Sequence, residues 1–143
     1  MAAFTAVAPT VRGTLDGLPS SIPLVLSGAY TATAHAEFAA PLNCRVIEAV
    51  CIQTSGTAGQ APVLSIEAWD PAASTPGSDV WETLIASAAI SSATTATTVV
   101  QVDPYASPIT NSSAQRAPRR RMRVTMTHPD TKSVTYSISV HGA

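Results

Sequence analysis

Histidine can act as an acid, a base or a metal ligand, but the spacing of the three histidines in this sequence does not favour a catalytic or metal site. His35, His128 and His141 lie in separate segments, and none has a second ligand at metal-binding spacing. The sequence has no G-x-S-x-G nucleophile motif and no glycine-rich phosphate loop followed by lysine. We therefore expect a protein that is not an enzyme, with no metal site and no cofactor.

Two aspartates and two cysteines are the other candidates. Asp70 and Asp79 bracket a connection (DPAASTPGSD) and could meet at its base to bind Ca²⁺. The loop between them offers no further carboxylate, and turn capping explains both aspartates without an ion. Cys44 and Cys51 are seven residues apart, so on one strand they would point to opposite faces. We expect buried free thiols, which suit assembly in a reducing cytoplasm.

The most unusual feature is an arginine cluster in a chain that is only 12% charged. Five of the seven arginines fall within eight residues, at positions 116, 119, 120, 121 and 123. On a strand, Arg119, Arg121 and Arg123 would share one face, with Arg116 just before them. Three readings stay open. The cluster protects a strand edge, forms ion pairs with a partner protein, or binds nucleic acid. The last reading is weakened by the lack of neighbouring aromatic side chains.

The composition favours strands and turns. The 143 residues suit one domain, and Ala, Val, Ser and Thr dominate, with few aromatic residues. A net charge of −1 gives no field that would attract nucleic acid or a membrane surface. No segment approaches the roughly 18 apolar residues of a membrane helix, and the first ten residues lack the features of a secretory signal. Low surface charge suits a protein whose surface is covered by partners.

Period-two patterns predict the elements that would position these residues. We expect strands at residues 22–26, 30–38, 45–54, 63–69, 80–85, 94–102, 119–127 and 133–140. Residues 45–54 are nearly all apolar and predict a central strand. The last two strands are expected to pair as a hairpin, residues 103–118 to form a long loop, and residues 84–90 to allow one helical turn.

The spacing of seven to eight strands predicts an all-β, two-sheet sandwich of jelly-roll or immunoglobulin-like type over residues 22–143. Residues 1–21 are irregular in pattern and allow two readings. They form an extended N-terminal arm that contacts a partner, or a frayed terminus. The apolar contacts of such an arm would be Val7, Val11, Leu15 and Leu18.

The stretch 46–84 carries a resemblance to a known class of proteins. An apolar strand (VIEAVCIQT) precedes a Gly/Thr-rich loop (SGTAGQAP), an alternating strand (VLSIEAW), an Asp-bounded turn and a strand that starts at Trp81 (VWETL). This order resembles small β-sandwich virion proteins of tailed bacteriophages, such as capsid decoration (cement) proteins and some head or tail accessory proteins.

That resemblance implies a structural role on the outside of a phage capsid. The partners would be the major capsid protein and sister subunits, often in a homotrimer. The N-terminal arm would reach neighbouring capsomers. The protein would be made in the host cytoplasm and end on the capsid exterior. The arginine cluster departs from the better-known small decoration proteins, which leaves the docking face open.

The sequence is also compatible with two other functions. The chain could be a tail or connector accessory protein, or a sandwich module that binds carbohydrate or a cell surface. Such modules use exposed aromatic side chains, and Trp69 and Trp81 flank the 70–79 connection, where they could form a platform. The alternative for both tryptophans is packing in the core.

Overall fold

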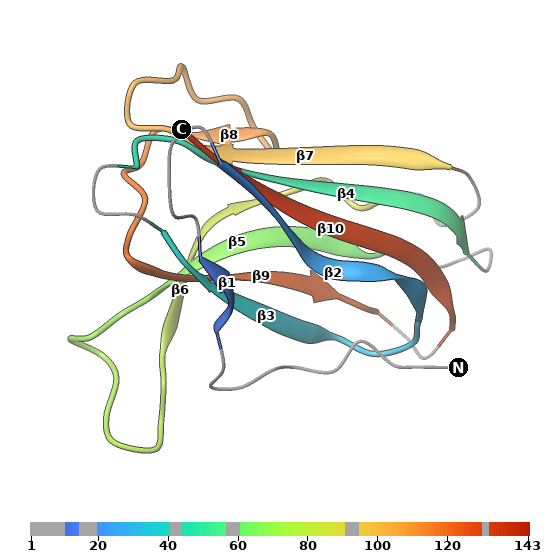
Figure 1. Cartoon of the computed structure of the whole chain (residues 1–143), viewed down its shortest axis with the longest axis horizontal. Helices are drawn as coiled ribbons and strands as arrows, with labels where there is room; N and C mark the ends of the chain where they lie inside the picture. The colour runs from blue at the N-terminus through green and yellow to red at the C-terminus, as the bar shows by residue number, and fades with distance from the viewer. Residues whose placement is uncertain (1–10, 15–19, 41–43, 57–60, 91–94, 130–131) are drawn as a thin grey trace.

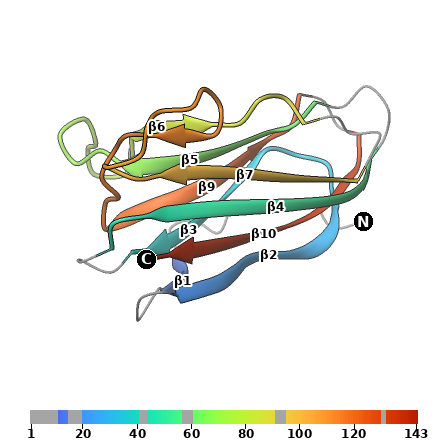
Figure 2. The same cartoon turned by 90° about the horizontal axis from the view of Figure 1, so that it is seen from above.

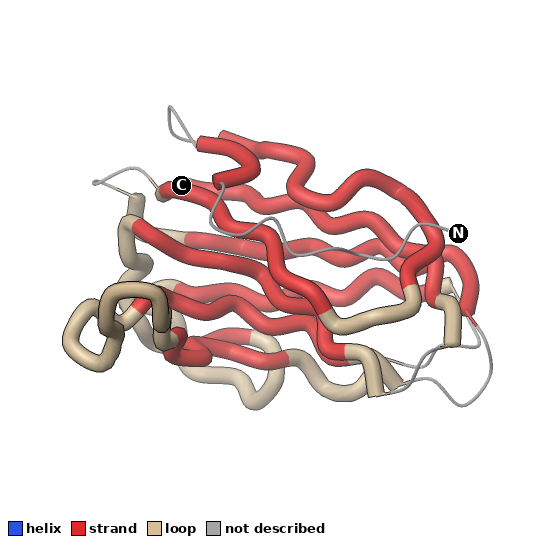
Figure 3. The backbone as a smooth tube through the Cα atoms, turned by 90° about the horizontal axis from the view of Figure 1, so that it is seen from below, coloured by secondary structure: helices blue, strands red, loops and turns tan. Residues whose placement is uncertain are grey.

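The fold is an all-β sandwich of two sheets that lie face to face (Figure 1). The computed structural model describes residues 11–14, 20–40, 44–56, 61–90, 95–129 and 132–143. These residues form ten strands and no helix (Figure 3). The view from above shows the two layers with their strands running in similar directions (Figure 2).

Each sheet contains five strands. Sheet A has the order β1 (Val11–Thr14), β3 (Ala34–Ala39), β9 (Arg121–Thr127), β5 (Val63–Trp69) and β6 (Trp81–Ala86). Sheet B has the order β2 (Ser20–Tyr30), β10 (Val134–Gly142), β4 (Ile47–Gly56), β7 (Ala96–Val102) and β8 (Ser113–Ala114). All pairings are antiparallel except β1 with β3 and β7 with β8.

The core lies between the sheets and follows the predicted alternation. In β10, every second residue is buried, from Val134 through Tyr136 and Ile138 to Val140. Sheet A contributes the buried side chains Phe38, Leu64, Ile66, Met122, Val124 and Met126. Each of these large side chains adds about 1.5–3 kcal/mol when buried. The spacing of apolar residues therefore fixes which face of each strand looks inward.

Two predicted strands match the structure closely. Residues 63–69 are β5 without any shift of bounds. The predicted apolar strand at 45–54 is β4, which lies in the middle of sheet B between β10 and β7. Pro23 lies in β2, an edge strand, as its proline predicts.

The predicted hairpin of the last two strands is wrong. β9 belongs to sheet A and β10 to sheet B, so the chain crosses from one layer to the other between them (Figure 1). Both strands carry a large apolar set on one face, and both sets are buried in the shared core. An alternating pattern specifies the buried face of a strand but not its neighbour.

Three smaller expectations also need correction. Residues 30–38 span the end of β2 and most of β3, and the predicted loop 103–118 contains the two-residue β8. The helical turn expected at 84–90 is absent. Instead, β6 continues to Ala86, and the Ser87 and Ile90 N–H groups donate to the carbonyls of Leu64 and Pro62 at 2.7 and 2.8 Å. The chain there stays extended beside β5.

The expected arm at residues 1–21 is partly built into the sandwich. Val11–Thr14 forms β1, which pairs with β3, and β2 already begins at Ser20. The predicted contacts Val7, Leu15 and Leu18 lie outside the described residues, as does the side chain of Val11.

Both cysteines are free and buried, as expected. Burial raises the pKa of the Cys51 thiol to about 12. The pKa of Cys44 is also raised by burial, against two backbone hydrogen bonds that lower it. These thiols behave as small core side chains.

Candidate functional site

Eight of the seventeen charged residues of the chain gather on and beside sheet A. We call this surface the arginine face. Its outer side is formed by Trp69, Trp81, Glu37, Glu67, Arg121 and Arg123, with Asp79 beside them. Glu82, Arg116 and Arg119 extend it at the margin of β6, where Glu82 lies opposite the buried Ala68. Sheet register creates the cluster, because Arg123 of β9 lies opposite Glu37 of β3 on one side and Glu67 of β5 on the other.

Every arginine of this face has a carboxylate partner in the same chain. Arg119 binds Glu82 at 2.6 Å, and Arg116 binds the other oxygen of the same carboxylate. Arg121 bridges Glu37 at 3.1 Å and Asp79 at 3.0 Å. These arginines hold the pKa values of the exposed carboxyls of Asp79 and Glu82 below their usual range.

The most enclosed pair lies at the centre of the arginine face. Arg123 and Glu67 form an ion pair with side chains only 18% and 13% exposed. Thr125 Oγ1 donates to the same Glu67 oxygen at 2.8 Å, and His35 Nδ1 lies 2.8 Å from that hydroxyl. Burial lowers the pKa of His35, with a further decrease from Arg123 and an opposing increase from Glu67. The network therefore joins three strands and favours a neutral imidazole.

The two tryptophans lie on this face and not in the core. Trp69 and Trp81 are cross-strand partners, and the guanidinium of Arg121 lies 5.1 Å from the centroid of each ring. The guanidinium of Arg123 lies 4.4 Å from the centroid of Trp81. Trp69 Nε1 also donates to Asp79 at 3.1 Å. Cation–π contacts occupy the ring surfaces that a sugar would stack on.

The structure changes the reading of the arginine cluster. β9 lies inside sheet A between β3 and β5, so protection of a strand edge is wrong. Arg120 does not join the face, and its guanidinium donates to the Ala40 carbonyl. The four arginines predicted as partner contacts, at 116, 119, 121 and 123, do come together, but they are neutralised within their own chain.

The outer face of sheet B has the opposite character. We call it the neutral face, formed by the outward positions of β10, β4 and β7. Thr135, Ser137 and Ser139 lie on β10, Val50, Ile52 and Thr54 on β4, and Thr97, Val99 and Gln101 on β7. Glu48 is the one charged residue at the outward positions of these three strands. Ile52 and Val99 are 45% and 41% exposed.

Sequence reasoning did not single out the neutral face, although its signal was present. The alternation of Ser and Thr with apolar residues in residues 133–140 indicates a strand whose outer side is polar and solvent-exposed but uncharged. Only the strand order shows that three such strands are neighbours, and that their outer sides form one surface.

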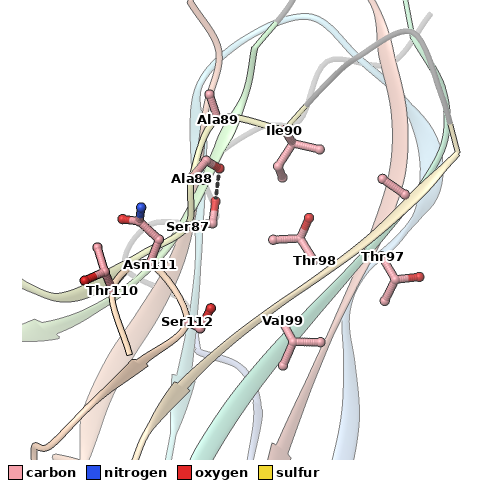
Figure 4. A pocket seen from close by; sticks show the side chains of 11 residues that line it. Ser87, Ala88, Ala89, Ile90, Thr97, Thr98, Val99, Thr110, Asn111 and Ser112 are labelled. Carbon is pink, nitrogen blue, oxygen red and sulfur yellow. Dashed lines mark hydrogen bonds between the residues drawn. The ribbon is translucent and has the colours of Figure 1, made fainter. Parts of the chain in front are cut away.

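A groove of about 460 Å³ lies at the margin of the sandwich beside the neutral face. We call it the β7 groove, and it is lined by residues 87–90, 96–99 and 110–112. Figure 4 shows Thr98 pointing from β7 towards Ile90 across it. None of the lining residues is charged.

The aspartates of the 70–79 connection have separate roles. Asp70 Oδ1 accepts hydrogen bonds from the Ala72 and Ala73 N–H groups at 2.9 and 3.2 Å, which is the predicted turn capping. Asp79 instead binds Trp69 and Arg121. Among the described residues, no three His, Cys, Asp or Glu side chains are placed to hold a metal ion.

The described part of the chain has no helix of the length and apolar character needed to cross a membrane. No protein-family model matches the sequence, and no curated protein matches it either.

Proposed function

We propose that this protein is a structural subunit that decorates and stabilises a phage capsid by binding its outer surface through the neutral face. The observation that carries the proposal is the contrast between the two outer faces of the sandwich. One is saturated with internal ion pairs, and the other presents mainly apolar and hydroxyl side chains, with Glu48 and its cross-strand partner His141 as its ionisable residues.

This contrast favours docking on the neutral face for a physical reason. Burying an ion pair of the arginine face under a partner would remove both charges from water. The contacts that the two charges already make would offset this desolvation cost only in part. Burying Ile52 or Val99 removes apolar surface from water at no such cost. Cores of protein interfaces are likewise depleted in charged residues. The major capsid protein and sister subunits are the proposed partners, with a homotrimer as the proposed assembly.

The experiment is co-sedimentation with expanded heads prepared without this protein. The wild-type chain is compared with Ile52→Lys, which puts a charge on the neutral face, and with Thr83→Lys, which puts the same charge on an exposed position of β6 in sheet A. We expect wild type and Thr83→Lys to sediment with heads and Ile52→Lys to lose at least tenfold in affinity. Binding to tails and not to heads would contradict capsid decoration and favour the accessory role.

Carbohydrate binding is the second function considered, and the geometry gives it less support. Trp69 and Trp81 are side by side as a platform requires, but Arg121 and Arg123 lie over their rings. A glycan array bound by the wild-type chain and not by a folded Trp81→Ala variant would favour it.

A further inference from the structure

A serine, a histidine and a glutamate lie in a row at one end of sheet B. Ser21 of β2 is the cross-strand partner of His141 of β10, which in turn is the partner of Glu48 of β4. These three strands are consecutive in the sheet and lie side by side in Figure 2. The residues are far apart in the sequence, so only the strand order brings the three side-chain types together.

The imidazole of His141 is held by a hydroxyl at each of its nitrogens. Ser21 Oγ lies 2.7 Å from Nδ1, and Ser139 Oγ lies 2.9 Å from Nε2. A neutral imidazole donates from one nitrogen and accepts at the other. Hydrogen bonds donated by a hydroxyl are typically shorter than those donated by an N–H group. The two distances therefore assign the Ser21 hydroxyl as the donor to Nδ1, and Nε2–H as the donor to Ser139.

The backbone register explains why Ser21 and His141 meet. The Ala143 N–H donates to the Val46 carbonyl at 3.1 Å and the Val46 N–H donates back at 2.8 Å, so the Ala143 backbone points towards β4. By alternation, the His141 backbone also points towards β4. Its pairing with Ser21 is therefore of the type without backbone hydrogen bonds, in which cross-strand side chains are closest.

Glu48 flanks the same imidazole from the opposite strand. Side chains directly opposed on neighbouring strands have Cβ atoms about 4.5–5.5 Å apart. The Glu48 carboxylate thus adds negative charge beside the His141 ring. A carboxylate in this place stabilises the imidazolium that forms when histidine accepts a proton. The row therefore combines a hydroxyl, a base and a carboxylate in the order that activates a nucleophile.

Another pair of a histidine and a hydroxyl, on sheet A, lacks these features. His35 Nδ1 lies 2.8 Å from Thr125 Oγ1, but that hydroxyl donates its proton to Glu67 at 2.8 Å. Thr125 is also only 4% exposed. Ser21, in contrast, is exposed on an edge strand, where a reactant can approach it from solvent.

We infer that Ser21 is a nucleophile, with His141 as its general base, and that it accepts an acyl group from activated carboxylic esters. Ser21 Oγ attacks the carbonyl carbon of the ester while its proton passes to His141 Nδ1. The bond from that carbon to the leaving oxygen then breaks, and the proton moves from His141 to the departing alcohol. The product is Ser21 acylated on Oγ.

The exposure of Ser21 limits what this nucleophile can do. Water, and not a preorganised set of donors, meets the oxyanion that develops on the ester. We therefore expect one acyl transfer per chain and no rapid turnover. The inference concerns the free protein, and it holds whether or not the neutral face docks on a capsid.

Acetylation of the free protein by p-nitrophenyl acetate tests the inference. Mass spectrometry of fragmented tryptic peptides measures the acetyl group on each serine over time. Ser27 is the internal control, because it is an exposed serine on the same strand whose hydroxyl contacts no histidine among the described residues. His141→Gln removes the base, and His35→Gln is the matched substitution at the histidine of sheet A.

We expect acetylation of Ser21 to be at least about tenfold faster than that of Ser27, since general-base assistance contributes a factor of this size or more. His141→Gln should lower the rate at Ser21 to that at Ser27, and His35→Gln should leave it unchanged. Ser139→Ala removes the acceptor that orients the ring and should slow Ser21 several-fold without changing Ser27.

Equal rates at Ser21 and Ser27 would overturn the inference, as would a rate at Ser21 that His141→Gln does not change. Acetylation of Ser139 in place of Ser21 would reverse the roles of the two hydroxyls and would also overturn it. Each of these results leaves the sedimentation test of capsid binding unaffected.

Discussion

At the scale of single residues, the arginine face is explained by partners that are far apart in the sequence. Glu37, Glu67, Asp79 and Glu82 each stand alone along the chain, and only the register of β3, β9, β5 and β6 brings them to the arginines. The arginine cluster could be predicted as one strand face from its spacing. Its neutralisation could not, because pairing between strands is not encoded in the spacing of either partner.

Burial separates the ion pairs of this face by their effect on stability. We expect Glu67→Ala to lower the free energy of unfolding by about 2–4 kcal/mol, because it leaves Arg123 enclosed without its partner and removes the acceptor of Thr125. Glu82→Ala should cost clearly less than Glu67→Ala, since its arginines are 49% and 42% exposed. Urea denaturation measures both, and equal losses would contradict this ranking.

His35 gives stability a pH dependence that starts near neutrality. Burial lowers the pKa of His35 in the folded protein, so the unfolded chain binds a proton first as the pH falls. Stability should be unaffected by His35 above its unfolded pKa of about 6.5 and should then decrease until the pH passes the folded pKa. His35→Asn should flatten the change in unfolding free energy between pH 7 and pH 5.5. An unchanged slope in that variant would show that another group titrates there.

At the scale of elements, alternation predicted the strands better than their arrangement. The buried faces of β4, β5, β9 and β10 follow directly from their apolar spacing. The expected β9–β10 hairpin is wrong because alternation specifies the buried face of each strand and not its neighbour, and the two strands lie in different sheets. The helical turn at 84–90 failed because Leu64 and Pro62 offer backbone acceptors that keep the segment extended.

Proline substitutions in β7 test the orientation of its backbone. The Gln101 N–H donates to the Ser112 carbonyl, away from β4, and the register with β4 has no bulge. By alternation, the Val99 N–H also points away from β4 and the Thr98 N–H points towards it. We expect Thr98→Pro to cost about 3 kcal/mol or more, because it breaks a ladder bond in the middle of sheet B. Val99→Pro should be milder by at least about 1 kcal/mol, as at other edge positions. Thermal unfolding of both variants provides the comparison, and the reverse order would contradict this orientation.

At the scale of the whole molecule, the sandwich divides its surface by charge. The charged side chains of the arginine face are paired within the chain, whereas the outward positions of β10, β4 and β7 in sheet B carry mainly Ser, Thr, Val and Ile, with Glu48 as their one carboxylate. The low content of charged residues predicts that partners cover part of the surface. The sequence did not show which side, because that depends on which strands share a sheet.

A subunit with the proposed role would bind more tightly because many copies bind to one capsid. Under the proposal, each copy on a capsid would contact several neighbours, so modest affinities would multiply through effective concentration. The expected outcome is a layer that stabilises the shell more than any single contact would.

Capsid disruption by heat tests the central claim most directly. Heads saturated with the wild-type chain should break at a temperature several degrees above bare heads, because the proposed binding to the intact shell and not to the broken one would stabilise the shell. Heads mixed with Ile52→Lys at the same concentration should break at the temperature of bare heads, and heads with Thr83→Lys at that of wild type. Heads that break at one temperature with or without the wild-type chain would contradict the proposal, as would equal protection by Ile52→Lys and wild type.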